Sequence, residues 1–336
     1  GKQSELEINS VIQEQTREID SLRKVYLNHP KDEDIINLLI DKYLLIDQDS
    51  NALVLTDELI FLQNKLQDHN EVARIRVLKH DILMRLGKGE EGILVLMKNI
   101  ENQDKISSQN LTDTYSEMAA YYTSTYEIEK ALEYAKKSEK IYMISHDSIG
   151  LAYTYYAIAI SYLTVDRLQE SLEYFEKAYL YCTSERYRNT AIILINISLI
   201  MSDLNRNDEA LEKLRIVDSI AAKHEIINLI PEIKKLYGIV YYNKQDYDKS
   251  LSYCLQGIKL AANLTVNARY KSSINKYAGY NYYKKGEYDQ AVYFLQQALN
   301  NDEYLVDLYE ANDASEYPLI DAYAKIGHFK DAYDLL

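Results

Sequence analysis

Apolar residues recur along most of the chain at the three- and four-residue spacing that places them on one face of a helix. The first such segment spans residues 5–27, and its apolar stripe consists of Leu6, Val11, Ile12, Ile19, Leu22 and Tyr26. Pro30 ends this helix. The longest apolar stretch, residues 191–201, contains Asn196 and Ser198, and it is shorter than the roughly 20 residues of a membrane-spanning helix. The pattern predicts an all-α protein with no membrane span in this region.

Residues that favour turns are scarce. The 336 residues include ten Gly and three Pro, where average usage would supply roughly 40 of the two together. Barrels, sandwiches and disordered chains all need more of them. The composition therefore favours long helices joined by short turns.

A small residue, which we call the anchor, recurs every 39 to 41 residues. The eight anchors are Ala52, Gly92, Ala131, Ser171, Ala210, Ser250, Ala291 and Ala332. Nine residues before them the chain has Tyr43, Leu83, Tyr122, Tyr162, Met201, Tyr241, Tyr282 and Tyr323. Five residues before them it has Asp47, Gly87, Tyr126, Asp166, Asn205, Gln245, Gly286 and Gly327. Six of these last eight favour turns, so we expect eight turns near residues 47–49, 87–89, 126–128, 166–168, 205–207, 245–247, 286–288 and 327–329.

Close packing explains this register. The two helices of a repeat are expected to cross at the anchor, where a side chain larger than Ser would push them apart. The Tyr nine residues earlier fills the space between neighbouring helices. A single repeat cannot bury its apolar faces, so the repeats are expected to stack.

Residues 272–305 resemble a tetratricopeptide repeat. The five positions that define the family are occupied here by Gly279, Tyr282, Ala291, Leu295 and Ala298. The resemblance covers residues 33–336 and implies a right-handed α–α superhelix of about eight repeats, preceded by a cap or partial repeat at residues 1–32. The chain departs from the family in lacking Trp and the terminal Pro, and in having a period of about 40 instead of 34 residues.

Two short motifs invite a chemical interpretation that the repeat register disfavours. Gly87, Gly89 and Gly92 match the G-x-G-x-x-G run of dinucleotide sites, but that run must follow a strand, whereas the preceding residues 72–86 are predicted to be helical. Residues 47–58 place oxygens as in a calcium-binding EF-hand loop, but they carry Ala52 where the loop needs Gly. The register explains both motifs as turn and anchor residues.

Nothing in the sequence indicates catalysis, a cofactor or a metal. No pair of His residues stands three or four positions apart, Cys182 and Cys254 belong to no metal-binding motif, and no H-E-x-x-H, G-x-S-x-G or P-loop occurs. An enzyme would have to assemble its site across several repeats, so we expect a protein that is not an enzyme. The net charge of −14, scattered over the chain, also disfavours nucleic acid as a partner.

Tyrosine is abundant, with 33 residues, and one group falls where the resemblance places a concave ligand groove. This group consists of Tyr153, Tyr156, Tyr242, Tyr280 and Tyr283, interleaved with Asn196, Lys235, Asn243, Lys276 and Lys284. Tyr suits recognition surfaces because its ring offers contact area at little entropic cost, although the same residues could simply form a solvated face. A groove requires Tyr156, Tyr242, Tyr280 and Tyr283 to be partly exposed on one concave surface. Its asparagines and lysines favour an extended peptide with acidic or carboxyl-terminal character.

We therefore expect a module that binds a peptide or protein segment, with a structural adaptor as the alternative. Repeats of this length look like those of bacterial peptide-sensing regulators and signalling proteins. Because the chain begins with Gly1 and stops four residues after Ala332, we expect a fragment of a larger protein. That protein is expected to be an extracytoplasmic sensor with a transmembrane helix further on, or alternatively a cytoplasmic peptide-responsive regulator. Ligand binding would change the curvature of the solenoid and move its last helix. The oligomeric state is left open.

Overall fold

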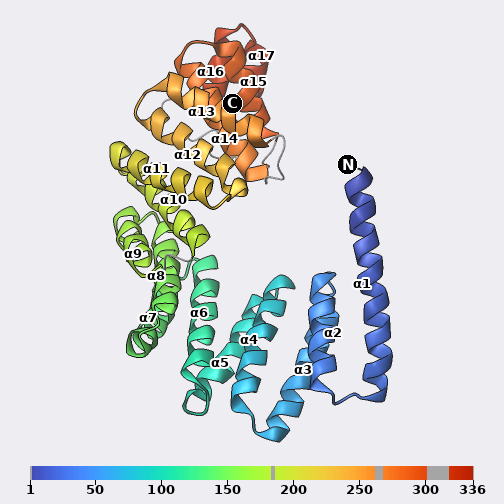
Figure 1. Ribbon diagram of the computed structural model, residues 1–336. Helices are drawn as coiled ribbons and strands as arrows, with labels where there is room; N and C mark the ends of the chain where they lie inside the picture. Colours follow the sequence, from blue (N-terminus) through green and yellow to red (C-terminus); the bar gives the residue numbers. More distant parts are fainter. Residues whose placement is uncertain (1, 183–185, 262–267, 301–317, 336) are drawn as a thin grey trace. The chain divides into compact units, whose positions relative to one another are not determined.

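The structure is a computed structural model that describes residues 2–182, 186–261, 268–300 and 318–335, and these residues contain helices and turns but no strand. The α-helices are α1 (Lys2–Asn28), α2 (Glu33–Leu45), α3 (Asp49–Leu66), α4 (His69–Arg85), α5 (Gly89–Glu101), α6 (Ser108–Ser124), α7 (Ile128–Ser145), α8 (Ser148–Leu163), α9 (Leu168–Tyr181), α10 (Tyr187–Asp203), α11 (Asn207–Lys223), α12 (Ile230–Asn243), α13 (Tyr247–Ala261), α14 (Ala268–Lys284), α15 (Tyr288–Leu299), α16 (Pro318–Lys325) and α17 (Phe329–Asp334) (Figure 1). Within the described residues, no helix is both long and apolar enough to cross a bilayer.

Contacts divide the chain into two compact units, residues 1–165 and 166–336. The first unit holds α1 to α8 and the second α9 to α17, and within each unit every helix packs against the next. We call the helix before each predicted turn helix A and the one after it helix B. The A helices are the even-numbered helices from α2 to α16, so the all-α tetratricopeptide-like solenoid predicted from the sequence is confirmed.

All eight predicted turns are present, and each has one residue in the left-handed conformation. These residues are Asp47, Gly87, Tyr126, Asp166, Asn205, Gln245, Gly286 and Gly327, with φ between 56° and 82°. In seven of the turns the backbone N–H of the following residue donates a hydrogen bond of 2.7–2.9 Å to the carbonyl nine positions before the anchor, as in Gln48 to Tyr43. Because the turn residue is left-handed, this hydrogen bond can form, and it pairs a carbonyl that the end of helix A would otherwise leave without a donor.

The anchors and the residues nine positions before them make up the interior of each repeat. All eight anchors are buried. Where the earlier residue is a half-buried Tyr, it stacks on an aromatic ring of helix B: Tyr122 on Tyr134, Tyr241 on Tyr253 and Tyr282 on Phe294, with centroids 5.4–5.7 Å apart and planes within 14° of parallel. The same contact, repeated, ties helix A to helix B.

The N-terminal helix is longer than predicted and packs on the first repeat. Ile19 is buried and contacts the apolar cluster of α2 and α3, with Leu22 and Tyr26 beside it. The Tyr26 hydroxyl donates a 2.5 Å hydrogen bond to Glu58 Oε2. The side chains of Leu6, Val11 and Ile12 lie outside the described part of α1.

Packing also explains the glycine run. Gly87 occupies the left-handed turn position with φ 71°, and a Cβ on Gly89 would lie 2.6 Å from the Tyr121 ring. A Cβ on Gly92 would lie 2.6 Å from Nδ1 of His80. In the stretch that resembles a calcium loop, helix α3 already begins at Asp49, and the carboxylates of Asp47 and Asp49 both pair with Arg85, at 2.9 and 3.1 Å.

Candidate functional site

The candidate site is the surface formed by the A helices of the second unit. In this unit α10 packs on α12, α12 on α14 and α14 on α16, so residues about 40 positions apart become neighbours. Eight of the ten residues predicted to line the groove belong to α10, α12 and α14. The other two, Tyr153 and Tyr156, lie on α8 of the first unit, where Tyr153 is 53% exposed and Tyr156 is half-buried.

Three half-buried tyrosines from two consecutive A helices form an aromatic cluster, which we call the tyrosine cluster. The ring of Tyr242 on α12 lies 5.6 Å from that of Tyr277 and 6.0 Å from that of Tyr280, both on α14. Tyr277 and Tyr280 are 6.2 Å apart, in an edge-to-face arrangement. Edge-to-face and tilted pairs at these distances suit the quadrupoles of aromatic rings, so the contacts hold the three rings in place.

A shared concave surface for Tyr156, Tyr242, Tyr280 and Tyr283 stays a prediction, because Tyr156 belongs to the first unit and the other three tyrosines to the second. Tyr156, Tyr242, Tyr280 and Tyr283 are each half-buried, neither enclosed in the core nor fully in solvent. Tyr283 extends the row of rings toward α16, because its hydroxyl donates a 2.8 Å hydrogen bond to Asp321 Oδ2. Its ring also packs edge-to-face on Tyr288, at 5.9 Å.

The tyrosine cluster and Tyr283 together form a row of rings, which we call the tyrosine row, and an acidic side chain lies at each end of it. Asp321 accepts a hydrogen bond from Tyr283 at one end. Asp203 on α10 lies at the other end, where the pKa of Tyr277 is raised first by burial and then by the negative charge of Asp203. Desolvation, reinforced by the charge of Asp166, raises the pKa of Asp203 itself to about 6. A ligand that covers this end therefore meets a carboxyl group that can be protonated near neutral pH.

The three predicted lysines have different surroundings. Lys235 Nζ pairs with Glu232 on the same helix at 2.7 Å and lies 5.6 Å from the ring centroid of Tyr270. Lys276 Nζ lies 5.9 Å from the ring centroid of Tyr277, which places its charge beside the tyrosine cluster. Lys284, at the end of α14, is exposed. Lys276 and Lys284 thus bring two positive charges to α14, next to the tyrosine cluster.

The two predicted asparagines make hydrogen bonds within the protein. Asn243 Nδ2 donates to Ser202 Oγ of the preceding A helix at 2.9 Å, and Asn196 Nδ2 donates to the Ile192 carbonyl at 2.9 Å. An asparagine side chain has a second N–H and an acceptor oxygen. The observed bonds hold each amide in one orientation and use one of its donors.

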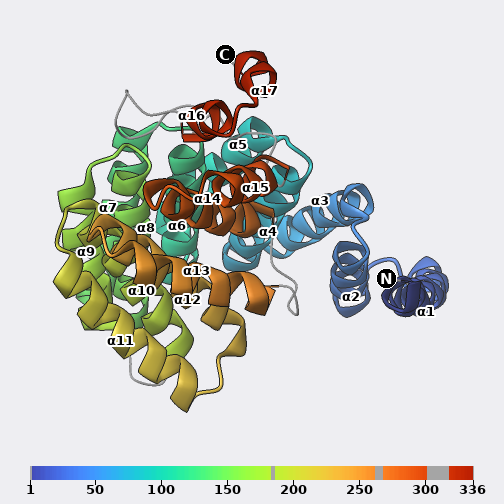
Figure 2. The ribbon, with the colours of Figure 1, turned by 90° about the horizontal axis from the view of Figure 1, so that it is seen from above.

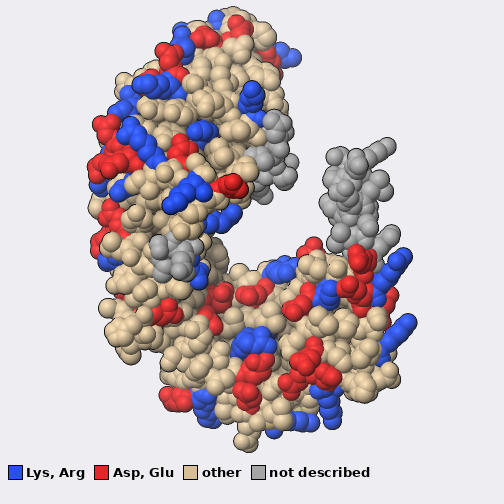
Figure 3. All heavy atoms as spheres, viewed as in Figure 1, with Lys and Arg blue, Asp and Glu red and all other residues tan. Residues whose placement is uncertain are grey.

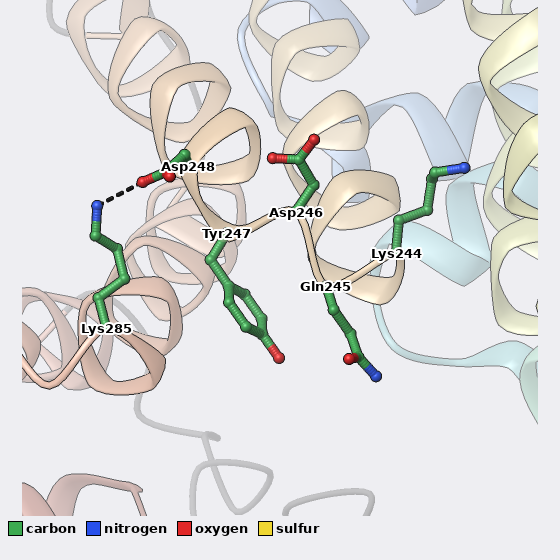
Figure 4. Close-up of a pocket in the computed structure, with 6 residues that line it drawn as sticks. All are labelled: Lys244, Gln245, Asp246, Tyr247, Asp248 and Lys285. Atoms are coloured by element: carbon green, nitrogen blue, oxygen red, sulfur yellow. Dashed lines mark hydrogen bonds and ion pairs between the residues drawn. The ribbon is translucent and has the colours of Figure 1, made fainter.

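A shallow hollow of about 550 Å³ adjoins the tyrosine cluster at the turn between α12 and α13 (Figure 4). It is lined by Lys244, Gln245, Asp246, Tyr247, Asp248 and Lys285. Lys285 pairs with Asp248 at 2.6 Å, and the Tyr247 ring lies 5.6 Å from that of Tyr242. The hollow therefore has balanced charge and shares an aromatic wall with the cluster. On the face drawn in Figure 3, acidic and basic side chains are likewise interspersed over the second unit.

Sequence reasoning missed Tyr277 and Asp203, although the register held a signal for each. Tyr277 stands fourteen residues before its anchor, as Asn196 does, and Asp203 stands seven residues before its anchor, as Asn243 and Lys284 do. The same two positions supply polar candidates in other repeats. Applying them to every repeat would have found both residues.

No protein-family model and no curated protein matches the sequence. Solved structures do match in fold. The apo form of RapI has a TM-score of 0.64 and 15% identity, covering 90% of this chain and 85% of RapI. The apo quorum sensor NprR from B. thuringiensis has a TM-score of 0.57 and 17% identity, covering 86% and 94%.

A third structure is the signal-transduction ATPase with a tetratricopeptide-repeat sensor from Pyrococcus horikoshii, with a TM-score of 0.62 and 15% identity. The match covers 96% of this chain and 51% of that protein, so this chain spans about half its length. These neighbours are tetratricopeptide-repeat proteins. The chain has the tetratricopeptide-repeat fold.

Proposed function

We propose that the A-helix surface of the second unit binds an extended peptide or protein segment. The observation that carries this proposal is the tyrosine cluster, because it brings together three half-buried tyrosines from the A helices of two repeats. Aromatic side chains dominate binding energy at interfaces because they bury a large area at small entropic cost. Solenoids present such surfaces over several repeats, which suits a ligand without structure of its own.

The charges around the cluster define the ligand further. Lys276 and Lys284 on α14 favour a carboxylate, either an acidic side chain or a free carboxyl terminus. Asp203 and Asp321 disfavour carboxylates at the two ends of the tyrosine row. We therefore expect a peptide whose acidic group lies over α14 and whose flanking residues are apolar or carry hydrogen-bond donors.

The biological role we propose is the sensor or interaction region of a bacterial signal-transduction or transcription-regulatory protein. NprR is a quorum sensor, and the repeats of the Pyrococcus protein are a sensor. Their fold supports a sensor role without defining the ligand. A structural adaptor that uses the B helices is the alternative, and the experiment below separates the two.

The test is affinity selection from random synthetic peptides that end in a free carboxylate. We expect the wild-type protein to enrich peptides with acidic residues, and Tyr280→Ala to weaken their binding by about tenfold or more because it removes a central ring. Tyr293→Ala is the matched control: Tyr293 is 55% exposed and lies on helix B of the same repeat. Equal binding by both variants and the wild type would place the peptides elsewhere and favour the adaptor.

The lysines are tested on the selected peptides by charge-neutral replacement. Lys276→Gln combined with Lys284→Gln should weaken a peptide with a free terminus or acidic residue, and should affect its amidated, neutral analogue much less. Lys235→Gln serves as the comparison, because Lys235 lies on the neighbouring helix α12 and not on α14. A larger effect from Lys235 than from the α14 pair would contradict the proposed position of the carboxylate.

A further inference from the structure

A second group of chemically active side chains lies in the first unit, away from the tyrosine cluster. It consists of His80 and Asp81 on α4 and Glu117 on α6, and the two helices pack against each other (Figure 2). Each residue offers one ligand atom, and these three atoms all lie within 4.8 Å of one another. Linear spacing gave no sign of this group, because Glu117 belongs to the following repeat.

The imidazole of His80 is the unusual member. It is 1% exposed, and its Nδ1 has no hydrogen-bond partner among the residues that the structure describes. A buried polar atom without a partner is costly. The ring is enclosed because the anchor beside it is Gly92, whose missing side chain leaves the space that Nδ1 faces. The other seven anchors are Ala or Ser. The repeat thus accommodates a buried histidine next to two carboxylates.

The charges around the group favour a cation. Asp81 and Glu117 each offer a carboxylate oxygen, and the negative charge of Asp113 on α6 also acts on Glu117. A bound cation would relieve the repulsion between these carboxylates.

We infer that His80, Asp81 and Glu117 form a binding site for a divalent transition-metal ion, with Zn²⁺ as the best match. One imidazole and two carboxylates are ligands that Zn²⁺ accepts, whereas Mg²⁺ and Ca²⁺ prefer oxygen alone. In tetrahedral coordination an ion about 2.1 Å from each ligand atom holds any two of them about 3.4 Å apart. The three ligand atoms lie within 4.8 Å of one another, so they need to close by up to about 1.4 Å, which rotation of the Asp81 and Glu117 side chains can supply.

The position of the site defines what the ion can do. His80 is buried, Glu117 half-buried and Asp81 exposed, so the ion would enter from solvent on the Asp81 side. Three protein ligands leave a fourth tetrahedral position open. That position would take water or a donor group from another molecule. The ion would also join α4 to α6, and thus one repeat to the next.

The experiment titrates Zn²⁺ into the full chain after treatment with EDTA and dialysis. Wild-type protein should bind Zn²⁺ at this site and melt at a higher temperature with the ion than without it. Asp81→Asn and Glu117→Gln should each weaken binding roughly tenfold or more and remove the shift in melting temperature. Glu129→Gln, at an exposed carboxylate of α7, should behave as wild type. Mg²⁺ should compete poorly.

His80→Gln completes the set. If this core variant folds, it should lose Zn²⁺ binding while Mg²⁺ binding stays as weak as before. If it does not fold, the two carboxylate variants decide the question alone. Unchanged Zn²⁺ affinity in Asp81→Asn and Glu117→Gln, or equal affinity of the wild type for Mg²⁺ and Zn²⁺, would overturn the inference.

Discussion

Gly92 and His80 show how one residue's size is set by another in the same repeat. A Cβ at residue 92 would lie 2.6 Å from Nδ1 of His80, closer than real side chains pack. The imidazole of His80 is buried, and helix α4, which carries it, contacts helix α5, which carries Gly92. Neither the ring nor either helix can therefore move without disturbing its neighbours. The glycine is therefore retained in a helix, where it normally lowers stability by up to about 1 kcal/mol relative to Ala.

Gly92→Ala is expected to lower the free energy of unfolding by about 1–3 kcal/mol through overpacking against His80. In a His80→Ala background the same change should cost nothing or stabilise, because Ala is the better helix former. Chemical denaturation of the two single variants and the double variant measures the coupling. Equal losses in both backgrounds would mean that His80 is not what excludes a side chain at residue 92.

The sequence predicts the anchor residues, but it does not predict contacts between single side chains of different repeats. The anchors recur eight times at one spacing, so their small size is visible in the linear order of residues. The proximity of His80 to Glu117 arises from the contact between α4 and α6, and it occurs once. A contact made once, between repeats, leaves no periodic signal.

Each pair of helices is closed by a left-handed residue, and this conformation is costly for residues other than glycine. Gly87, Gly286 and Gly327 occupy three of the eight positions, while Tyr126 and Gln245 are among the others. The predicted turns were correct because this backbone requirement is local and is repeated in every unit. The identity of the side chain at this position matters less for the turn, since the side chain of Tyr126 is exposed.

Tyr126→Gly should therefore raise the free energy of unfolding by about 1 kcal/mol, since Gly adopts a φ of 60° without steric cost. Gly286→Ala should lower it by a similar amount. Thermal or urea unfolding measures both changes. Ala120→Gly, at an exposed position inside α6, is the control and should destabilise by up to about 1 kcal/mol. A loss of stability in Tyr126→Gly would show that its side chain, and not its backbone, matters.

Contacts along the chain divide it into two units, in which each helix packs mainly on its neighbours in sequence. Stability in such a molecule is approximately a sum over repeats and the interfaces between adjacent repeats. Local damage is therefore expected to remain local. The sequence predicted the repeats but not this division, because the anchor spacing continues unchanged past Asp166. Part of the candidate site follows the register, since Tyr242 and Tyr280 of the tyrosine cluster are among the eight predicted residues. The contacts that join Tyr242 to Tyr280 and Tyr277 are made between repeats.

Leu96→Ala tests this locality by hydrogen exchange. Leu96 is 0% exposed and packs with Ile93 and Met118, so its truncation should cost about 2–5 kcal/mol. Amide exchange should accelerate in α4 to α6 and stay unchanged in α13 to α15. Leu94→Ala, at a residue of the same helix that is 62% exposed, should change little. Uniform acceleration along the whole chain would show instead that the protein unfolds as one cooperative unit.

The tyrosine cluster has an optical consequence. The chain contains 33 Tyr and no Trp, so its ultraviolet emission comes from tyrosine alone. The rings of Tyr242, Tyr277 and Tyr280 are 5.6–6.2 Å apart, close enough to pass excitation among themselves and on to an indole laid over them. A bound peptide that carries a tryptophan would then receive excitation energy from the cluster and emit at wavelengths where the tyrosines themselves do not. Binding of such a peptide could therefore be followed by energy transfer from the unlabelled protein.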